Sequence, residues 1–549
     1  MKTAKSLYYF LLILFVLTLS VFSEGVEEQV QRPVPDAELT AKLPIGMNIP
    51  DLKYYRTSLV FNDVMTTASP MITYHGDYWD TKLFQEMEID ENGYPMYLPQ
   101  PTSDGENSKA RFLVNNYYYG RYRVFYEGIG TLSGSHLQSD NEGYYIDFTG
   151  DGENCWINIT TSQKGNHLRN IRIIPDGFTP ADLVNGSLSI FIGSYMEGLK
   201  GFHALRFMDW SGTNNSKQVY WEDRVTKEYY TQGGYLGASF DYAIDLCNEL
   251  QADAWVCVPH MASDDYIIQQ AQLFKDNLNP HLKIYLEYSN EVWNGMFEQA
   301  LWIQNNASYP PAVDSYVSED LAEIHSGDDM LTEKSAYMMA RLFTLWEQVF
   351  GDEMENRVVR VATSQHAVPD KSRRILGYLF NEDNPFGAVG CDTLAVGGYF
   401  GYTTENHQAW LRKGETLTNE DIYRDVYYTF LNQSYHWTMG SAGIAHEYGV
   451  DYMVYEGGQH MNPFQAKVDW NYSDIFFDFQ KNERMYDLYI HNFNLHMEEN
   501  IDCELFMAYS YISPRRYRYG SWGHLESLSQ VGGSYEDAPK YRALLDANL

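Results

Sequence analysis

The stretch IYLEYSNEVWNG, residues 284–295, begins as a buried strand and ends on polar residues. Ile284 to Tyr288 is rich in strand formers, and Ser289, Asn290 and Glu291 follow where the strand should end. A strand that served only the core would be followed by a plain turn. The Asn-Glu pair therefore indicates a strand whose end presents functional side chains, and its meaning depends on the sheet to which it belongs.

Short apolar runs alternate with helix-period segments from about residue 200 onward, which predicts a parallel sheet covered by helices. The expected strands are residues 43–48, 205–210, 254–260, 284–289, 358–364, 393–399, 452–456 and 503–510. Helix signals lie between them, such as Ser263 as an N-cap before the apolar stripe that starts at Ile267. Eight strands with intervening helices favour a (β/α)8 TIM barrel over an open doubly wound sheet, and no GxGxxG follows the first strand to indicate a dinucleotide.

The gap between the first two expected strands is too long for one helix. It contains closely spaced alternating segments broken by Gly, Asp and Asn, such as EGYYIDFTGDGENCWINITTS, which predict an antiparallel, jelly-roll-like β-sandwich. We expect this insertion at residues 94–176, with the start of the barrel at 24–93 and its remainder at 177–549. The sandwich either binds carbohydrate or forms one wall of a cleft, and the sequence leaves both readings open.

The first residues have the layout of a secretory signal. Lys2 and Lys5 precede the apolar run from Leu7 to Phe22, and Ser-Glu-Gly follows. The run is 16 residues long, which is short for a stable membrane span. We expect a signal peptide at residues 1–23, removed from a secreted protein with no stable membrane span. An uncleaved N-terminal anchor is the alternative.

The composition limits the partners. Thirty-nine basic against 74 acidic side chains give a formal net charge of −35, which repels phosphate backbones, so nucleic acid is excluded as a main partner. Aromatic residues make up 15% of the chain, which suits surfaces that stack on sugar rings. The five cysteines contain no CxxC pair, so no metal site is predicted, and Cys391 and Cys503 are expected to be buried thiols.

Two carboxylates are expected at the ends of strands of the predicted barrel. Glu291 ends the fourth strand, and Glu456 in YMVYEGGQH ends the seventh, where Gly457 and Gly458 are expected to allow a sharp turn and leave room for a ligand. Active sites of such barrels lie at the carboxyl ends of the strands. Retaining glycoside hydrolysis needs two carboxyl groups about 5–5.5 Å apart, and an inverting pair lies farther apart.

On these residues the chain resembles the clan of retaining TIM-barrel glycoside hydrolases, the cellulase-like enzymes, in which an Asn-Glu pair ends the fourth strand and a Glu ends the seventh. The resemblance implies that Glu291 is the acid/base, that Glu456 is the nucleophile and that Asn290 binds the sugar 2-hydroxyl. It also implies cleavage of β-linked polysaccharide or oligosaccharide without a cofactor. The predicted insertion and the loop at 308–329 are absent from the ordinary small cellulase barrel, so they leave the substrate open.

Further strand ends supply candidates for substrate binding. Arg206 is expected to keep Glu456 ionised, so that the pKa of Glu456 stays low while that of Glu291 rises. An ion pair of Arg206 with Asp209 or another acid is the structural alternative. His260 and Tyr399 end the third and sixth strands, where the clan carries groups that orient the carboxylates or the sugar. Trp522 resembles the clan's sugar-stacking tryptophan. Trp293 is expected to line a neighbouring subsite.

Two other functions use the same scaffold. A carbohydrate-binding or adhesion protein would keep the barrel and the sandwich without hydrolysis, but it has no use for two mutually repelling carboxylates. A transglycosylase uses the same residues and differs only in whether a sugar or water reacts in the second step, which the sequence does not distinguish.

Overall fold

The computed structural model of the chain describes residues 34–76, 79–98, 108–305, 330–462, 472–515 and 520–549. The expected signal peptide at 1–23 and the loop at 308–329 lie outside the described residues. The chain divides into two compact units, Met1–Ala37 and Glu38–Leu549, and every element below belongs to the second.

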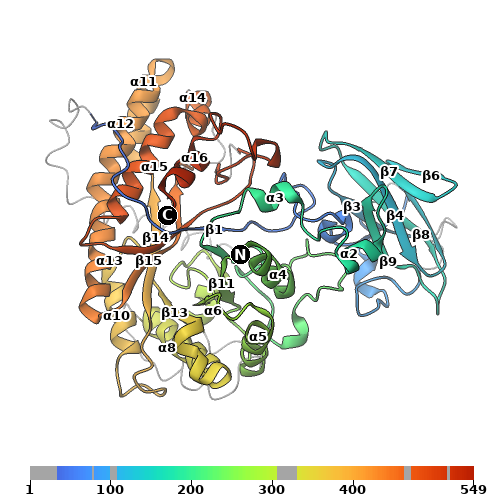
Figure 1. The fold of residues 1–549 in the computed structure, drawn as a ribbon, viewed down its shortest axis with the longest axis horizontal. Helices are drawn as coiled ribbons and strands as arrows, with labels where there is room; N and C mark the ends of the chain where they lie inside the picture. Colours follow the sequence, from blue (N-terminus) through green and yellow to red (C-terminus); the bar gives the residue numbers. More distant parts are fainter. Residues whose placement is uncertain (1–33, 77–78, 99–107, 306–329, 463–471, 516–519) are drawn as a thin grey trace, which may run out of the picture. The chain divides into compact units, whose positions relative to one another are not determined.

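Eight parallel strands close into a barrel in the order in which they occur along the chain (Figure 1). They are β1 (Ile45–Asn48), β10 (Ala204–Arg206), β11 (Asp253–Val258), β12 (Ile284–Tyr288), β13 (Val358–Thr363), β14 (Thr393–Phe400), β15 (Asp451–Gln459) and β16 (Cys503–Ala508). The first strand pairs with both β10 and β16, which closes the ring. The predicted (β/α)8 TIM barrel is confirmed, and each predicted run overlaps its strand.

Helices lie between the barrel strands and after the last of them. They are α2 (Pro180–Asn185), α3 (Gly193–Glu197), α4 (Phe240–Leu250), α5 (Asp264–Asn277), α6 (Glu298–Asn305), α8 (Met330–Phe350), α9 (Met354–Arg357), α10 (Pro369–Leu379), α11 (Thr404–Lys413), α12 (Asn419–Thr429), α13 (Tyr435–Tyr448), α14 (Ser473–Asp478), α15 (Glu483–His496) and α16 (Pro539–Ala547). Helix α5 begins as predicted, because the Ser263 hydroxyl accepts a hydrogen bond from the Tyr266 amide. In the described part of the chain, none of the helices combines the length and apolar character that a bilayer span requires.

The barrel interior is filled by side chains that alternate along the strands. Trp255 stacks on Tyr285 with ring centroids 5.2 Å apart, and both belong to one buried cluster with Met453 and Met507. Period-two alternation places Cys257 on the same side as Trp255, and Glu287 on the same side as Tyr285. The interior of the barrel is therefore apolar at the level of Trp255 and Tyr285. Glu287 faces inward one layer closer to the carboxyl ends of the strands.

Two antiparallel sheets lie between β1 and β10, with strand orders β2-β3-β8-β5 and β6-β7-β4-β9. Their strands are β2 (Ile72–Tyr74), β3 (Lys109–Val114), β4 (Tyr119–Glu127), β5 (Gly130–Gly134), β6 (Leu137–Asp140), β7 (Gly143–Thr149), β8 (Cys155–Ser162) and β9 (Arg169–Pro175). Phe112 of one sheet and Ile146 of the other belong to one hydrophobic cluster. Strand β2 lies before the predicted boundary at residue 94, so the prediction missed it. A three-residue strand is too short to show the alternation on which that boundary was based.

All five cysteines are buried free thiols, as expected for Cys391 and Cys503.

Asp63 connects the segment after β1 with strand β9. Its carboxylate accepts hydrogen bonds from the Met65 and Ile173 amides at 3.1 and 2.9 Å, and it pairs with Arg172 at 3.1 Å. The residue is only 3% exposed, and burial raises its pKa against the effect of these partners. A buried carboxylate of this kind is held in place by its partners and is costly to leave without them.

We expect Asp63→Asn to lower the free energy of unfolding by about 2 kcal/mol, because the amide keeps one acceptor oxygen and leaves Arg172 without its counter-charge. Urea unfolding measures this change. Asp147→Asn is the matched control, since Asp147 pairs with Arg121 at the surface and its loss should cost less than about 1 kcal/mol. Equal effects of the two substitutions would contradict a structural role for Asp63.

Candidate active site

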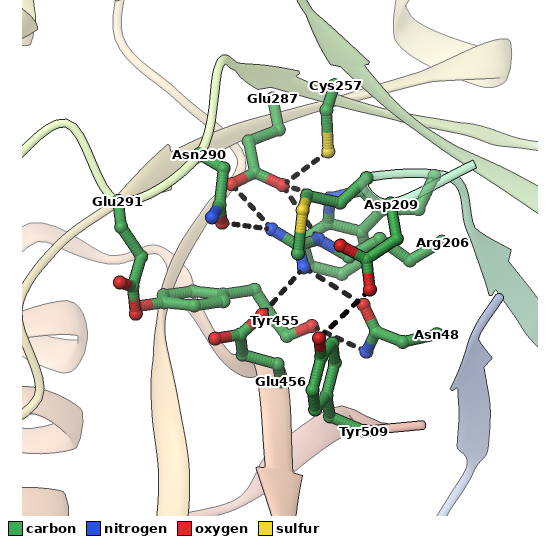
Figure 2. A network of polar contacts seen from close by, with 12 residues as sticks. Asn48, Arg206, Asp209, Cys257, Glu287, Asn290, Glu291, Tyr455, Glu456 and Tyr509 are labelled. Atoms are coloured by element: carbon green, nitrogen blue, oxygen red, sulfur yellow. Dashed lines mark hydrogen bonds and ion pairs between the residues drawn. The ribbon is translucent and has the colours of Figure 1, made fainter. Parts of the chain in front are cut away.

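Arg206, the last residue of β10, lies at the centre of a buried polar network (Figure 2). Its side chain is 0% exposed, so each of its five N–H groups needs an acceptor within the protein. Nε and one N–H of Nη2 donate to Glu287 at 2.9 and 3.0 Å. The other N–H of Nη2 donates to Asn290 at 2.9 Å. Nη1 donates to Asn48 at 2.9 Å and to Glu456 at 3.1 Å. All five donors are used.

The turn after β12 explains the polar end of the opening stretch. Ser289 and Glu291 both have positive φ angles, 56° and 42°, on either side of Asn290. Non-glycine residues in this region are strained by about 1–3 kcal/mol each, and they persist only where their surroundings fix them. Here Arg206 holds the Asn290 side chain, and Gln299 donates to the Asn290 carbonyl at 2.8 Å. The turn presents Glu291, whose carboxylate accepts a hydrogen bond from Asn294 at 2.9 Å.

Glu456 reaches the network because strand β15 is irregular. Val396 of β14 pairs with Val454, but the next residue, Gly397, pairs with Glu456, so Tyr455 is an extra residue in the ladder. A bulge of this kind lets two consecutive side chains face the same side. Tyr455 joins the barrel interior, and Glu456 accepts from Arg206. Figure 2 shows Tyr455 beside both carboxylates, and its hydroxyl donates to Glu291 at 3.4 Å.

The two glycines after Glu456 do not form the expected sharp turn, since β15 continues to Gln459. A Cβ atom on Gly457 would lie 2.5 Å from the Phe506 ring and 2.8 Å from the Gly398 carbonyl. Gly458 has a φ of 128°. The glycines therefore allow close packing and an unusual backbone beside the bulge, which corrects the prediction that they leave room for a ligand.

The carboxyl groups of Glu456 and Glu291 are electrostatically linked. The pKa of Glu456 is raised to about 8, first by burial and then by the charge of Glu291, against the lowering effect of Arg206. The pKa of Glu291 is also raised, by burial first, while the hydrogen bond from Asn294 lowers it. Two like charges in a buried site titrate as a pair, so the two groups hold one proton between them near neutral pH.

The prediction that Arg206 keeps the pKa of Glu456 low is therefore wrong for the free protein. Arg206 donates twice to Glu287 and only once to Glu456, so much of its charge is already balanced. The alternative, a structural ion pair of Arg206 with Asp209 or another acid, is confirmed for another acid, since Arg206 pairs with Glu287 at 2.9 Å. Asp209 instead accepts from the Tyr509 hydroxyl at 2.9 Å, and its pKa is raised to about 6, chiefly by burial.

Two of the other predicted residues lie at the site. The ring of Tyr399 is 6.0 Å from that of Trp522, and Tyr509 is 5.6 Å from Trp522. His460 contacts both Tyr399 and Trp522 at 5.4 and 5.3 Å. The charge of Glu456 is among the causes that raise the pKa of Tyr399, after burial, which places this aromatic group beside the carboxyl pair.

Among the described residues, His260 and Trp293 contact other groups than the two carboxylates. His260 is buried against Trp302 at 5.6 Å, and burial lowers its pKa to about 3, so it is neutral at physiological pH. Trp293 lines a small pocket with Thr332 of α8 and Ile375 of α10. Both residues follow strand ends; Trp302 belongs to α6, and the pocket of Trp293 also includes Thr363 and Ser364 at the end of β13.

Seven residues of the network were not predicted as site residues: Asn48, Asp209, Trp255, Cys257, Glu287, Tyr455 and Tyr509. Asn48 ends β1 and Tyr509 follows β16, so the rule of strand ends could have found both. Glu287 is a stronger signal, because an acidic residue within a buried strand needs a partner. The position of Tyr455 depends on the bulge, which no local pattern indicates.

Glu456 should make the stability of the protein depend on pH. A glutamate in an unfolded chain has a pKa of about 4.3, so the folded chain holds the extra proton and loses stability as the pH rises toward 8. Glu456→Gln keeps an acceptor oxygen for Arg206 without the charge. We expect the free energy of unfolding of the variant, relative to the wild type, to increase by at least about 1 kcal/mol between pH 5 and pH 8. Guanidinium unfolding at both pH values measures this; a constant difference would show that Glu456 is ionised throughout.

Within the described residues, no group of three or more His, Cys, Asp and Glu side chains is arranged to hold a metal ion.

A comparison of the sequence with protein-family models finds no match, and neither does a comparison with curated proteins. Solved structures of glycoside hydrolases are similar to part of the chain. The GH51 arabinofuranosidase from Xanthomonas axonopodis pv. citri is 12% identical over 58% of this chain, with a TM-score of 0.34, and the match spans 59% of that enzyme. The GH1 β-glucosidase from Humicola insolens is 12% identical over 64% of this chain and 86% of its own, with a TM-score of 0.34. The β-glucosidase from Thermotoga maritima is 12% identical over 64% and 85%, with a TM-score of 0.33. The barrel assignment itself rests on the strand pairing of this chain.

Proposed function

We propose that the chain is a secreted retaining glycoside hydrolase that cleaves β-linked glycans by double displacement, with Glu456 as nucleophile and Glu291 as acid/base. The observation that supports this function is the placement of the two carboxyl groups. They come from the fourth and seventh strands of a closed barrel and meet at Tyr455, at the end of the barrel where substrates bind.

In the first step, a carboxylate oxygen of Glu456 attacks the anomeric carbon while the bond to the leaving oxygen breaks. Glu291 gives its proton to that oxygen, so the product leaves as a neutral alcohol. In the second step, Glu291 takes a proton from water, and the water oxygen displaces Glu456 from the anomeric carbon. The site returns to its starting state with one proton on the carboxyl pair.

The electrostatics suit this sequence of steps. The reaction needs one ionised and one protonated carboxyl group, which is the state that two coupled buried acids favour near neutral pH. In the productive arrangement the proton lies on Glu291, and Arg206 stabilises the Glu456 carboxylate through its single N–H at 3.1 Å.

Neighbouring side chains suit a sugar ring. Tyr399, Tyr509 and Trp522 present aromatic surface next to the carboxylates, on which a pyranose or furanose can stack. The Asn290 amide donates one N–H to Asn214 at 3.0 Å, and its second N–H is proposed to bind the 2-hydroxyl. His260 and Trp293 enter this proposal as scaffold.

The remaining parts of the chain fit a secreted enzyme. The two sheets between β1 and β10 are proposed to form a sandwich domain inserted in the barrel, since they share one hydrophobic cluster.

The leader at residues 1–23 is proposed to be removed on export. N-terminal sequencing of protein collected outside the cell would test the cleavage, and retention of Met1 would favour the anchor.

Activity on a panel of 2,4-dinitrophenyl β-glycosides and soluble β-glycans tests the function directly. We expect the wild type to release dinitrophenol or reducing ends from at least one member, and Glu456→Gln to lower kcat by about 10⁴-fold, as loss of a nucleophile does in other enzymes. Sugar transfer to added acceptors would indicate a transglycosylase. Glycan binding without release by either protein would favour the non-catalytic alternative.

Glu291→Ala separates the two roles. A dinitrophenyl leaving group needs little acid assistance, so its release in the first step should survive, whereas hydrolysis of an unactivated glycan should fall by about 10²–10⁴-fold. Azide should then replace water as nucleophile and give a β-glycosyl azide, detected by mass spectrometry and NMR. An α-glycosyl azide, or no azide product from an active enzyme, would contradict the assignment of Glu291.

A further inference from the structure

We propose that Glu287 is a positioning residue of this site. Through its two hydrogen bonds it fixes the Arg206 guanidinium in the orientation that directs one N–H to Asn290 and another to Glu456, and its negative charge compensates the charge of Arg206. This role rests on the proposed function in one respect: the aligned groups are those assigned to the chemistry.

Glu287 is buried within β12 and is not available to a ligand. It is 0% exposed and accepts four hydrogen bonds: two from Arg206, one from Trp255 Nε1 at 2.7 Å and one from Cys257 Sγ at 3.1 Å. An ionised carboxylate has about four acceptor sites, so these donors satisfy it as an anion. Figure 2 shows it on the side of Arg206 away from Glu456. It is therefore not a third reacting carboxylate.

The contacts of Glu287 determine where Arg206 points. Guanidinium is planar, and the paired bonds to one carboxylate fix both its plane and its rotation. Asn48 supplies a third fixed acceptor, and it is itself held because its amide donates to the Tyr455 and Ala508 carbonyls at 3.2 and 3.3 Å. With three N–H groups used by the scaffold, the remaining two have only one direction each, toward Asn290 and Glu456.

Charge balance gives Glu287 a second effect. A cation beside a carboxyl group lowers its pKa, and Arg206 would act on Glu456 with its full charge if Glu287 were neutral. The other titratable or charged groups that face the carboxyl pair are Asp209 after β10, Cys257 of β11, Tyr399 of β14, Tyr455 of β15 and Tyr509 after β16. Arg206 is the cation among these groups, and the charges of Asp209 and Glu287 both oppose its effect on the pKa of Glu456. Of these two acids, Glu287 is the one that pairs directly with Arg206.

Two substitutions separate orientation from charge. Glu287→Gln keeps the shape and removes the charge, whereas Glu287→Asp keeps the charge and withdraws the carboxylate by one methylene. Asp63→Asn is the matched control, because it also removes a buried acid that pairs with an arginine but lies outside the network. The pH dependence of kcat/KM and of kcat is measured with the dinitrophenyl β-glycoside that the wild type cleaves fastest.

For Glu287→Gln we expect the alkaline limb of the kcat/KM profile to move to lower pH by about one unit or more, because the uncompensated Arg206 lowers the pKa of the pair. For Glu287→Asp we expect the limb to stay in place and kcat to fall by about 10²-fold through misplacement of Glu456. Asp63→Asn should change neither. If Glu287→Gln has both the wild-type position of the alkaline limb and the wild-type kcat, the proposal is overturned. If Glu287→Gln does not fold, Glu287→Asp decides, and an unchanged kcat would overturn it.

A second readout needs no turnover. Protein with ¹³C in the side-chain carboxyl of glutamate is titrated by NMR, and the resonances of the pair are assigned with Glu291→Gln and Glu456→Gln. We expect the upper titration of the pair to move to lower pH in Glu287→Gln. If no glycoside is cleaved but this shift is present, the proposed function fails and the role of Glu287 stands. If glycosides are cleaved and the titration does not move, the role of Glu287 fails alone.

Discussion

A guanidinium buried without access to water must find a partner for every donor, and this requirement organises the mouth of the barrel. Arg206 satisfies it with acceptors from β1, the interior of β12, the turn after β12 and β15. Side chains from elements distant in sequence are thereby held around the planar guanidinium of Arg206. The strained turn at Ser289 and Glu291 and the bulge at Tyr455 are tolerated because each delivers a group to this network.

The barrel and the pair of glutamates could be predicted because both depend on local patterns. Strands buried on both faces are short apolar runs, so β11 to β16 stand out from the polar segments around them. Once strands are counted, the carboxyl end of each is known, and a polar residue there is a candidate for the site. Glu291 follows this rule directly, and Arg206 ends the second strand.

The remaining features depend on geometry that no local pattern carries. A strand end does not determine which neighbours a side chain contacts. His260 and Trp293 were expected at the sugar site, and the structure shows His260 against Trp302 and Trp293 beside Thr332 and Ile375. The bulge that turns both Tyr455 and Glu456 inward results from the pairing of β15 with two neighbours. The pKa of Glu456 could not be predicted either, because Glu287 balances Arg206 and burial then dominates.

The position of Glu287 shows how the barrel supports charge above an apolar core. Trp255 and Cys257 belong to the hydrophobic interior, yet each turns its one polar atom upward to Glu287. These donors keep an anion stable where water is excluded, and the anion in turn keeps Arg206 in place. Much of the charge of Arg206 is then already balanced by Glu287. The carboxyl pair therefore retains a proton that free glutamates would lose. Burial and the mutual repulsion of Glu291 and Glu456 are the main causes of the raised pKa of the pair, and the charge of Glu287 adds to them.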